Sequence, residues 1–366
     1  MRFFIIAGEP SGDIHAAKLI SALAALDPNA TFTGLGGDRM RDAGCKLYQD
    51  YRSMAFMGYA AVVRNLSNVR RNFQLAHEAL IHERPDVLIL IDYPTFNLRL
   101  AEYCREHLPD TKIYYYIPPK VWAWKRFRIH RIARLTDAIL GIFPFEPNFY
   151  HKFGYNCHYV GNPTVEEVRE YLQLHPEPAV QDTPYIAILP GSRPSEISHC
   201  LPKMLAAAKR FPKYKIRVAA APGVKDEFYA KYLDADTPLV REPYPLVQNA
   251  YAAIVNSGTA TLETALLGCP QVAVYHVDCP HLFTLFWKMF FKLRRFTLPN
   301  IILGRTVIKE KLATHFTVDE VADELNRLLE NESYRAKILA DYTALGRMLG
   351  SRSASTTAAQ YIISNT

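Results

Sequence analysis

Short apolar runs alternate with amphipathic stretches through the first half of the chain. Six of these runs are typical of β-strands, and the stretches 14–26 and 64–83 have the spacing of helices that bury one face. Several runs are apolar without alternation, which is typical of a parallel sheet covered by helices on both faces. The six runs are RFFIIAG at 2–8, TFTGLGG at 31–37, DVLILID at 86–92, KIYYYIPP at 112–119, DAILGIFP at 137–144 and CHYVGNP at 157–163.

The same alternation starts again after a charged, proline-containing stretch at 164–184. This restart predicts a boundary near 163–183 and an α/β fold of two doubly wound, Rossmann-like domains that face each other across a cleft. We expect residues 1–165 in the first domain and 166–339 in the second, with a C-terminal helix at about 340–366 that packs back on the first. The runs of the second half are YIAILPGSR at 185–193, KYKIRVAAAPG at 213–223, TPLVREPYP at 237–245, YAAIVNSGTATLE at 251–263 and QVAVYHV at 271–277.

The segment HLFTLFWKMFFKLRRF at 281–296 differs from its surroundings, because most of its residues are large and apolar and four are Lys or Arg. A helix of this length spans roughly 24 Å, which is too short and too charged to cross a bilayer. Two interpretations stay open: a buried helix whose lysines reach solvent, or a helix lying in the interface of an anionic membrane. The residues that would contact the membrane are Phe286, Trp287, Lys288, Phe290, Phe291 and Lys292.

The composition narrows the range of functions. The 366 residues include 43 Lys and Arg against 36 Asp and Glu, and the net charge of +7 suits an anionic small molecule, an anionic membrane or nucleic acid. No zinc module or RNA-binding signature is present, and the six cysteines are scattered without a CxxC pair, which favours a reduced, cytosolic protein. The first apolar run is too short for a signal peptide and predicts a buried strand instead.

Asp92 ends the strand predicted by VLILID, which is otherwise apolar. A carboxylate at the carboxyl end of a parallel strand lies where ligands bind, and burial there would raise its pKa and suit it to act as a general base. The alternative is a structural role, in which Asp92 caps the turn that follows through Tyr93 and Pro94.

Two loops in the second half have the composition of anion-binding sites. Gly191, Ser192 and Arg193 lie between a predicted strand and a helix start, where backbone N–H groups and an arginine can bind phosphate. The second loop repeats this arrangement, with Glu263 in the first turn of its helix, where the carboxylate can accept ribose hydroxyls. Both loops could be ordinary capped helices, but two of them in one domain favour a diphosphate nucleotide. The second loop offers Asn256, Ser257, Gly258, Thr259 and Thr261.

Two segments of the first half are less decisive. AGEPSGD at 7–13 allows a tight turn in which Ser11 or Asp13 caps the next helix, and it matches neither GxGxxG nor a Walker motif. PPKVWAWKRFRIHRIARL at 118–135 combines Trp122 and Trp124 with a basic run. That combination fits a sugar-phosphate or nucleic-acid contact, and equally a solvated basic helix packed by its tryptophans.

Taken together, these motifs resemble the lipid-A-disaccharide synthase family, membrane-peripheral glycosyltransferases of Gram-negative bacteria. The resemblance implies a GT-B fold. It also implies transfer of the sugar from UDP-2,3-diacylglucosamine to 2,3-diacylglucosamine 1-phosphate, which gives a β(1→6) disaccharide and UDP. The motifs occur in the family's order along nearly the whole chain: AGEPSGD, MG, IDYPTFN, VWAWK, FPFE, VGNP, LPGSRPSEI, SGTATLE and LPNIILGR.

The resemblance also implies roles for single residues. Asp92 would be the catalytic base, Arg193 and Glu263 would bind UDP, and Asn300 would belong to the surroundings of the active site. The partners implied are the two acylated sugars and the cytoplasmic surface of the inner membrane, and we expect no cofactor, metal or nucleic acid. The residues expected to line the acceptor cleft are Glu9, Ser11, Asp13, Asn97, Trp122, Trp124 and Asn300.

Four positions depart from the family's pattern: Ala61, Thr95, Pro118 and Lys120. They affect the expected acyl-chain preference and acceptor contacts, whereas the chemistry rests on Asp92, which is present. Two other functions stay open at this point. One is a related sugar-nucleotide enzyme, such as a UDP-GlcNAc epimerase or a transferase with a soluble acceptor. The other is a non-catalytic lipid-binding protein.

Overall fold

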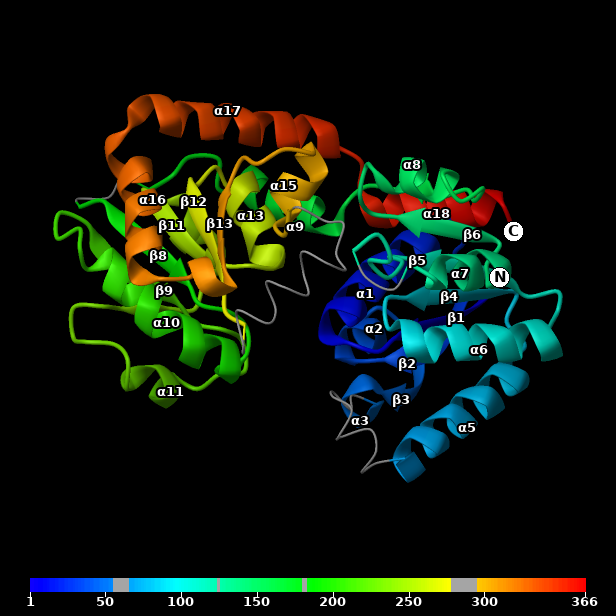
Figure 1. The fold of residues 1–366 in the computed structure, drawn as a ribbon. Helices are drawn as coiled ribbons and strands as arrows, with labels where there is room; N and C mark the ends of the chain where they lie inside the picture. The colour runs from blue at the N-terminus through cyan, green and yellow to red at the C-terminus, as the bar shows by residue number, and fades with distance from the viewer. Residues whose placement is uncertain (55–65, 124–125, 180–182, 278–294) are drawn as a thin grey trace. The chain divides into compact units, whose positions relative to one another are not determined.

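The computed structural model describes residues 1–54, 66–123, 126–179, 183–277 and 295–366. This part of the chain forms two compact units, each built on one parallel β-sheet (Figure 1). Unit 1 comprises Met1–Pro163 with Ser351–Thr366, and unit 2 comprises Thr164–Gly350. The predicted fold class, two Rossmann-like α/β domains, is confirmed.

The sheet of unit 1 has the strand order β3-β2-β1-β4-β5-β6-β7, and all neighbouring strands are parallel. The order reverses between β1 and β4, so the sheet is doubly wound around that pair. The strands are β1 (Arg2–Ala7), β2 (Thr31–Gly36), β3 (Lys46–Asp50), β4 (Val87–Ile91), β5 (Lys112–Tyr116), β6 (Ala138–Gly141) and β7 (His158–Tyr159). The helices are α1 (Pro10–Leu26), α2 (Asp38–Asp42), α3 (Tyr51–Met54), α5 (Leu66–Glu83), α6 (Pro94–His107), α7 (Arg128–Leu135), α8 (Glu146–His151) and α18 (Ala354–Ser364).

Alternate residues of the central strands enter two different cores, which is why these strands are apolar without interruption. Tyr115 packs with the helices α5, α6 and α7 on one face of the sheet, and its neighbour Tyr114 packs with α1 and α18 on the other (Figure 1). The register pairs Leu90 of β4 with Tyr115 of β5, and residues paired in this way point to the same face of the sheet. Burial on both faces leaves the strand ends as the places where polar side chains can reach a ligand.

The sheet of unit 2 has the order β10-β9-β8-β11-β12-β13, again parallel throughout, and it reverses between β8 and β11. The helices α10 and α16 contact each other over this sheet. The strands are β8 (Tyr185–Leu189), β9 (Lys215–Ala219), β10 (Leu239–Val240), β11 (Ala252–Asn256), β12 (Gln271–Tyr275) and β13 (Lys309–Leu312). The helices are α9 (Pro163–Leu174), α10 (Pro194–Ala208), α11 (Asp226–Ala230), α12 (Pro243–Gln248), α13 (Thr259–Leu266), α15 (Leu298–Leu303), α16 (Val318–Glu330) and α17 (Glu332–Leu349), with a 3₁₀ turn at Ala313–His315.

Two edge strands were not predicted. β3 has the sequence KLYQD and β13 has the sequence KEKL, and each forms an outer strand of its sheet. None of their residues is fully buried, because an edge strand has a neighbour on one side only. Polar and charged side chains are usual on such strands because they oppose pairing with other molecules, and they remove the apolar signal used for prediction.

The chain leaves unit 2 at the end of α17 and returns to unit 1 with α18, which packs against α1. The last sixteen residues, 351–366, therefore belong to unit 1, while residues up to Gly350 belong to unit 2. Within the described residues, no helix is long and apolar enough to cross a membrane. Almost all of the segment 281–296 lies outside the described residues, so both interpretations of it stay predictions.

Asp13 supports the local fold in a way that the sequence did not predict. The expectation that Ser11 or Asp13 caps the first helix is wrong, because α1 already begins at Pro10 and contains both residues. The carboxylate of Asp13 is buried and instead accepts hydrogen bonds from the backbone amides of Gly37, Arg39 and Met40, at 2.8, 3.1 and 3.1 Å. It therefore caps the beginning of α2 and ties that helix to α1.

Replacing Asp13 with Ala should lower the free energy of unfolding by roughly 2–4 kcal/mol, because three amides at the start of α2 lose their acceptor and two of them are buried. Asp13→Asn keeps one acceptor oxygen and should cost less than half as much. Urea denaturation followed by circular dichroism measures both. Equal stability of the Ala variant and the parent would contradict this role.

Candidate active site

The loops that follow β1 and β4 meet at the point where the strand order of unit 1 reverses. The ring of Tyr93 packs directly against Gly8, since a Cβ atom built on Gly8 would lie 2.4 Å from two ring carbons of Tyr93. Only glycine therefore allows this contact. Glu9 follows and is exposed, and its charge adds to the effect of burial in raising the pKa of Tyr93. Gly8, Glu9, Asp92 and Tyr93 thus share one edge of the sheet.

Asp92 lies at this edge, one residue beyond β4, and is partly buried. Burial raises the pKa of its carboxyl above the ordinary value of 3.8, and the charge of Lys120 and the amide of Tyr93 partly oppose this shift. The predicted direction of the pKa shift is therefore confirmed. Tyr93 occupies the N-cap position of α6, and its backbone amide bonds to the Asp92 carboxyl, so the turn-capping role and the role as a base both stay predictions.

Several residues predicted at the acceptor cleft lie elsewhere in unit 1. Ser11 is exposed in the first turn of α1, near the edge, whereas Asn97 is fully buried beneath Asp92. The side-chain amide of Asn97 donates to the carbonyl oxygens of Ile91 and Asp92, at 3.1 and 2.7 Å. Asp13 and Asn97 were predicted to line the acceptor cleft, but the structure buries both side chains, which bond to backbone groups within unit 1. Trp124 lies outside the described residues.

Trp122 is also buried, and its partner is a carboxylate that sequence reasoning did not single out. Its indole N–H donates to Oε1 of Glu146 at 3.1 Å, so Trp122 supports the loop after β5 from inside unit 1. Oε2 of Glu146 accepts from the amides of Ile142 and Phe143, at 2.8 and 2.9 Å. Burial raises the pKa of Glu146 to about 7, although these three hydrogen bonds favour its charged form. The motif FPFE was the available signal, since Glu146 is its last residue.

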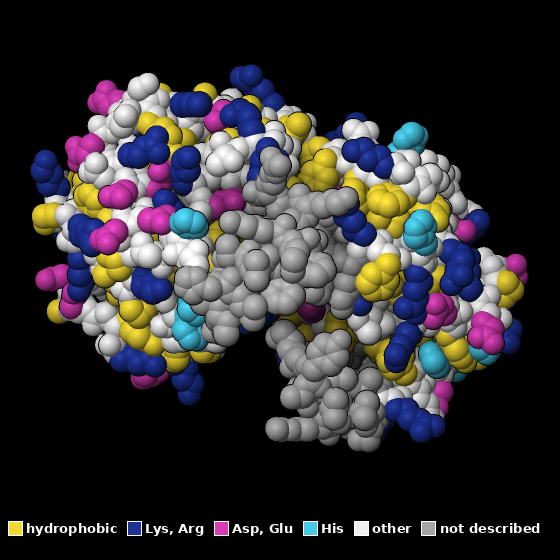
Figure 2. All heavy atoms as spheres, in the orientation of Figure 1, with side chains coloured by type: hydrophobic (Ala, Val, Ile, Leu, Met, Phe, Trp, Pro, Cys, Tyr) yellow, Lys and Arg dark blue, Asp and Glu magenta, His cyan; other side chains and the backbone are white. Residues whose placement is uncertain are grey.

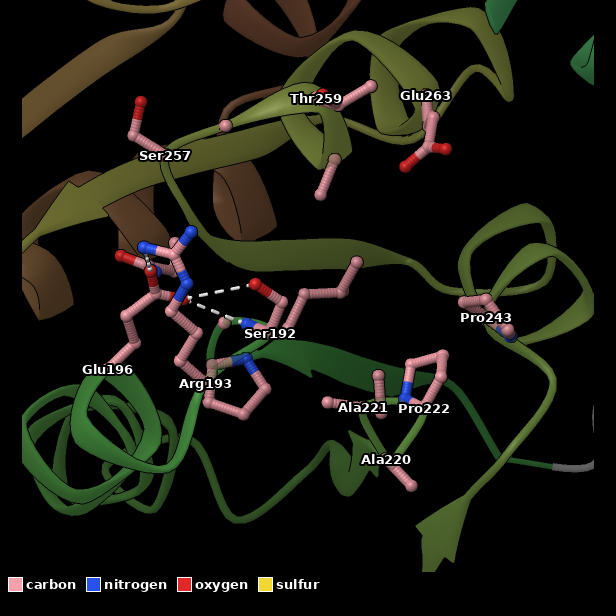
Figure 3. A pocket seen from close by; sticks show the side chains of 17 residues that line it. Ser192, Arg193, Glu196, Ala220, Ala221, Pro222, Pro243, Ser257, Thr259 and Glu263 are labelled. Carbon is pink, nitrogen blue, oxygen red and sulfur yellow. Dashed lines mark hydrogen bonds and ion pairs between the residues drawn. The ribbon is translucent and has the colours of Figure 1, made fainter. Parts of the chain in front are cut away.

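Unit 2 has a cavity of about 460 Å³ at the carboxyl ends of β8 and β11, where its own strand order reverses. Figure 3 shows Ser257, Thr259 and Glu263 on one side of the cavity and Ser192, Arg193 and Glu196 on another. The two loops that the sequence predicted as anion sites thus line one cavity. The other lining residues are Leu189, Pro190, Gly191, Ala219, Ala220, Ala221, Pro222, Pro243, Asn256, Gly258 and Ala260.

In the loop after β8, the carboxylate of Glu196 contacts the groups that were predicted to bind phosphate. Oε2 of Glu196 accepts from the backbone N–H of Ser192 at 2.9 Å, and Oε1 lies 4.0 Å from a guanidinium nitrogen of Arg193 (Figure 3). Gly191 has a φ of +124°, and a Cβ there would lie 2.7 Å from the same carboxylate. Glu196 therefore holds the loop in shape and occupies one amide that the sequence had assigned to phosphate.

The loop after β11 leads directly into α13, whose N-cap residue is Gly258 and whose first residue is Thr259. The amide of Ser257 donates to the carbonyl of Val274 at 2.8 Å, whereas the first N–H groups of a helix have no partner within the helix. A Cβ on Gly258 would meet no atom within 4 Å. The prediction for Thr261 is wrong, because its side chain is fully buried and its hydroxyl donates to the carbonyl of Gly258 at 2.8 Å.

Glu263 lines the cavity from the second turn of α13, one turn later than predicted. The hydroxyl of Tyr244 donates to its Oε1 at 3.2 Å, and burial raises the pKa of the Glu263 carboxyl. A carboxylate in this position can accept hydroxyl hydrogen bonds from a ligand in the cavity.

Asn300 is fully buried away from this cavity. Its Nδ2 donates to the carbonyl of Ile308 at 2.7 Å and to Oε1 of Glu310 at 2.8 Å. Its Oδ1 accepts from the amides of Val307 and Ile308, at 2.7 and 2.9 Å. The side chain is thus fully used in joining α15 to β13, and it does not line the cavity of unit 2.

Comparison with known proteins identifies the family. The model of the family described as lipid-A-disaccharide synthetase matches residues 3–362. The chain belongs to this family. Membership confirms the predicted enzyme class, a glycosyltransferase that forms the disaccharide of lipid A.

Two relatives illustrate the extent of the match. The lipid-A-disaccharide synthase of Myxococcus xanthus is 37% identical over 381 residues, with 99% of this chain and 97% of the relative covered. The lipid-A-disaccharide synthase of Geobacter sulfurreducens is 34% identical over 366 residues, with 95% and 93% covered.

Similar solved structures extend over the whole chain at low sequence identity. The UDP-GlcNAc 2-epimerase of Neisseria meningitidis, solved with UDP-GlcNAc, has a TM-score of 0.68 at 13% identity, and all of both chains is covered. The calicheamicin glycosyltransferase CalG4 has a TM-score of 0.61 at 14% identity, covering 99% of this chain and 97% of its own. These likenesses confirm the predicted GT-B fold. They support the epimerase alternative at the level of the fold only.

Proposed function

We propose that this enzyme joins UDP-2,3-diacylglucosamine to 2,3-diacylglucosamine 1-phosphate, forming the β(1→6) disaccharide and releasing UDP. The observation that carries the proposal is the partly buried carboxylate of Asp92 at the ligand edge of unit 1, in a chain of the family that makes this disaccharide. A second support is the cavity of unit 2, whose two loops carry amides, hydroxyls and an arginine suited to a diphosphate.

The donor nucleotide binds in the cavity of unit 2. Its diphosphate lies at the start of α13, where the first N–H groups and the positive end of the helix attract anions. The guanidinium of Arg193 approaches from the loop after β8, and the carboxylate of Glu263 accepts the ribose hydroxyls. The amide of Ser192 already donates to the carboxylate of Glu196. The loop after β8 therefore binds the diphosphate mainly through the guanidinium of Arg193.

Asp92 acts as the general base on the acceptor. Its carboxylate takes the proton of the acceptor 6-hydroxyl as that oxygen forms a bond to the anomeric carbon of the donor. The bond between this carbon and UDP breaks, and UDP leaves with the electron pair. The single displacement inverts the anomeric centre. A carboxylate whose pKa is raised by burial binds the proton more tightly and is a stronger base. Glu9 and Ser11 at the same edge are the exposed polar groups for acceptor hydroxyls.

The membrane is the proposed source of both acylated substrates. Figure 2 shows Lys and Arg side chains spread among acidic ones over the visible face of each unit, so the described surface on this side has no single basic region. The segment 281–296 combines basic and large apolar residues in one stretch. We therefore assign contact with the cytoplasmic surface of the inner membrane to this segment, with Phe286, Trp287, Phe290 and Phe291 entering the acyl boundary.

Asp92→Asn should keep the fold and UDP binding but lower turnover by roughly 10²–10⁴-fold, the usual effect of removing a general base. The matched control is Asp86→Asn, at the opposite end of β4, where the carboxylate pairs with Arg2. UDP release with both acylated substrates is the assay. In the parent, activity should fall as pH drops through the raised pKa of Asp92, because protonation removes the base. Near-normal turnover of a folded Asn variant would exclude the assignment.

Arg193→Ala should weaken UDP binding roughly 10- to 150-fold, since a charge-assisted bond to phosphate contributes about 1.5–3 kcal/mol. Arg210→Ala is the control, because Arg210 is a similarly exposed arginine just after α10 that pairs with Asp319 and does not line the cavity. Isothermal calorimetry with UDP measures both variants. The diphosphate role fails if the Arg193 variant binds UDP as tightly as the control.

Replacing Phe286, Trp287, Phe290 and Phe291 with Ser should release the protein from anionic liposomes and reduce its need for detergent. Each lost aromatic removes on the order of 1.5–3 kcal/mol of apolar transfer. Turnover should fall on substrates held in liposomes and persist on substrates dispersed in detergent. Phe127→Ser is the control, because Phe127 is exposed and lies outside the segment. A variant that aggregates or unfolds would support the buried-helix interpretation instead.

A further inference from the structure

The backbone at the ligand edge of unit 1 has an unusual conformation. Asp92 and Tyr93 have φ values of +43° and +41°, and Ile117, after the neighbouring strand β5, has +59°. None of the three is glycine, and Ile117 is β-branched, so each adopts the left-handed region at a cost. Such conformations persist only where the surrounding structure holds them, and they are concentrated at functional sites.

Hydrogen bonds from two buried side chains hold Asp92 in this conformation. Its carbonyl oxygen accepts from the hydroxyl of Tyr115 at 2.6 Å and from Nδ2 of Asn97 at 2.7 Å. Its own amide donates to the carbonyl of Ile117 at 3.2 Å, which ties the strained residues of the two loops together. Nδ2 of Asn97 also donates to the carbonyl of Ile91 at 3.1 Å. The peptide groups on both sides of Asp92 are therefore fixed.

Neither donor side chain is explained by packing alone. Tyr115 is fully buried on β5, and its hydroxyl extends to the carboxyl edge of the sheet to reach Asp92. Asn97 is fully buried in the first turn of α6, and within the described part of the chain its Oδ1 has no hydrogen-bond partner. Burying an amide with one end unsatisfied costs stability, so a compensating role is expected.

We infer that Tyr115 and Asn97 are positioning residues that fix the backbone of Asp92 and thereby aim its carboxylate at the acceptor hydroxyl. This inference rests on the proposed role of Asp92 as the base. Without the two donors, the carbonyl of Asp92 is free to turn and the residue can relax out of the left-handed region. Relaxation changes the direction of the Cα–Cβ bond and moves the carboxylate away from the reacting hydroxyl, even though nothing that touches substrate has been altered.

The chain supplies a matched control on the same strand. Tyr114 is as buried as Tyr115 but faces the opposite core, and its hydroxyl donates to the carbonyl of Asn365 at 2.9 Å. Tyr114→Phe and Tyr115→Phe therefore each remove from β5 a hydroxyl that donates to a backbone carbonyl, and the Tyr114 hydroxyl also lies 3.2 Å from Oγ1 of Thr366. Only Tyr115→Phe removes a bond to Asp92.

Tyr115→Phe should lower kcat by roughly 10- to 100-fold, the scale expected when a reacting group is slightly misplaced, with the KM of both acylated substrates within about twofold of the parent. Tyr114→Phe should keep kcat within about twofold, while both variants lose a similar few degrees of melting temperature. The measurements are steady-state UDP release in detergent and thermal unfolding. Equal kcat values for the two Phe variants would overturn the inference, as would a raised KM with unchanged kcat for Tyr115→Phe.

A second variant tests the other donor and covers the case in which Tyr115→Phe does not fold. Asn97→Ala removes both bonds of Nδ2 and should lower kcat at least as much as Tyr115→Phe, again without a matching rise in KM. Unchanged kcat in a folded Asn97→Ala would overturn the role of Asn97. Asp92→Asn, measured alongside, tests the base role of Asp92 separately from the positioning role of Tyr115 and Asn97. If the Asp92→Asn enzyme has a normal kcat, the base assignment fails. If it is inactive while Tyr115→Phe has the same kcat as Tyr114→Phe, only the positioning inference fails.

Discussion

A strand that is buried on both faces can present a polar side chain to a ligand only where it ends. Every residue of β4 is at most 1% exposed, so Asp92 is the first position after that strand at which a carboxylate can approach substrate. The same limit applies in unit 2, where β8 and β11 are buried and the polar residues that line the cavity lie at or beyond the strand ends, at Ser192, Asn256 and Ser257. The position of each proposed ligand group therefore follows from how the two sheets are covered.

The same burial sets the acid–base properties at these strand ends. Asp92 borders an apolar sheet, and desolvation raises its pKa more than Lys120 and the Tyr93 amide lower it. Glu263 experiences the same effect at the edge of unit 2. Desolvation thus has the largest effect on the pKa of both Asp92 and Glu263.

Apolar patterning in the sequence predicted the strands and their ends, whereas the roles of buried polar side chains depend on hydrogen bonds that the sequence does not show. The eleven predicted runs correspond to eleven of the thirteen strands in the described residues, and the ends of these strands then located Asp92 and the two loops of unit 2. The edge strands β3 and β13 were missed because half-exposed strands lack that signal. Asp13, Asn97 and Asn300 were predicted at ligand sites because polar residues in family motifs look alike in sequence. Only the fold shows that these side chains are buried and bond to groups inside their own unit, most of them backbone groups.

Two carboxyl groups near the ligand edge of unit 1 differ in what their oxygens contact, and this difference separates their roles. Both oxygens of Glu146 accept from N–H donors of Trp122, Ile142 and Phe143, so this carboxylate is committed to joining the loops after β5 and β6. In Asp92 the side-chain donors of Tyr115 and Asn97 bond to the carbonyl oxygen, whereas the carboxylate interacts with the backbone amide of Tyr93 and the charge of Lys120. The buried side chains therefore restrain Asp92 through its backbone, as the proposed role of its carboxylate as a base requires.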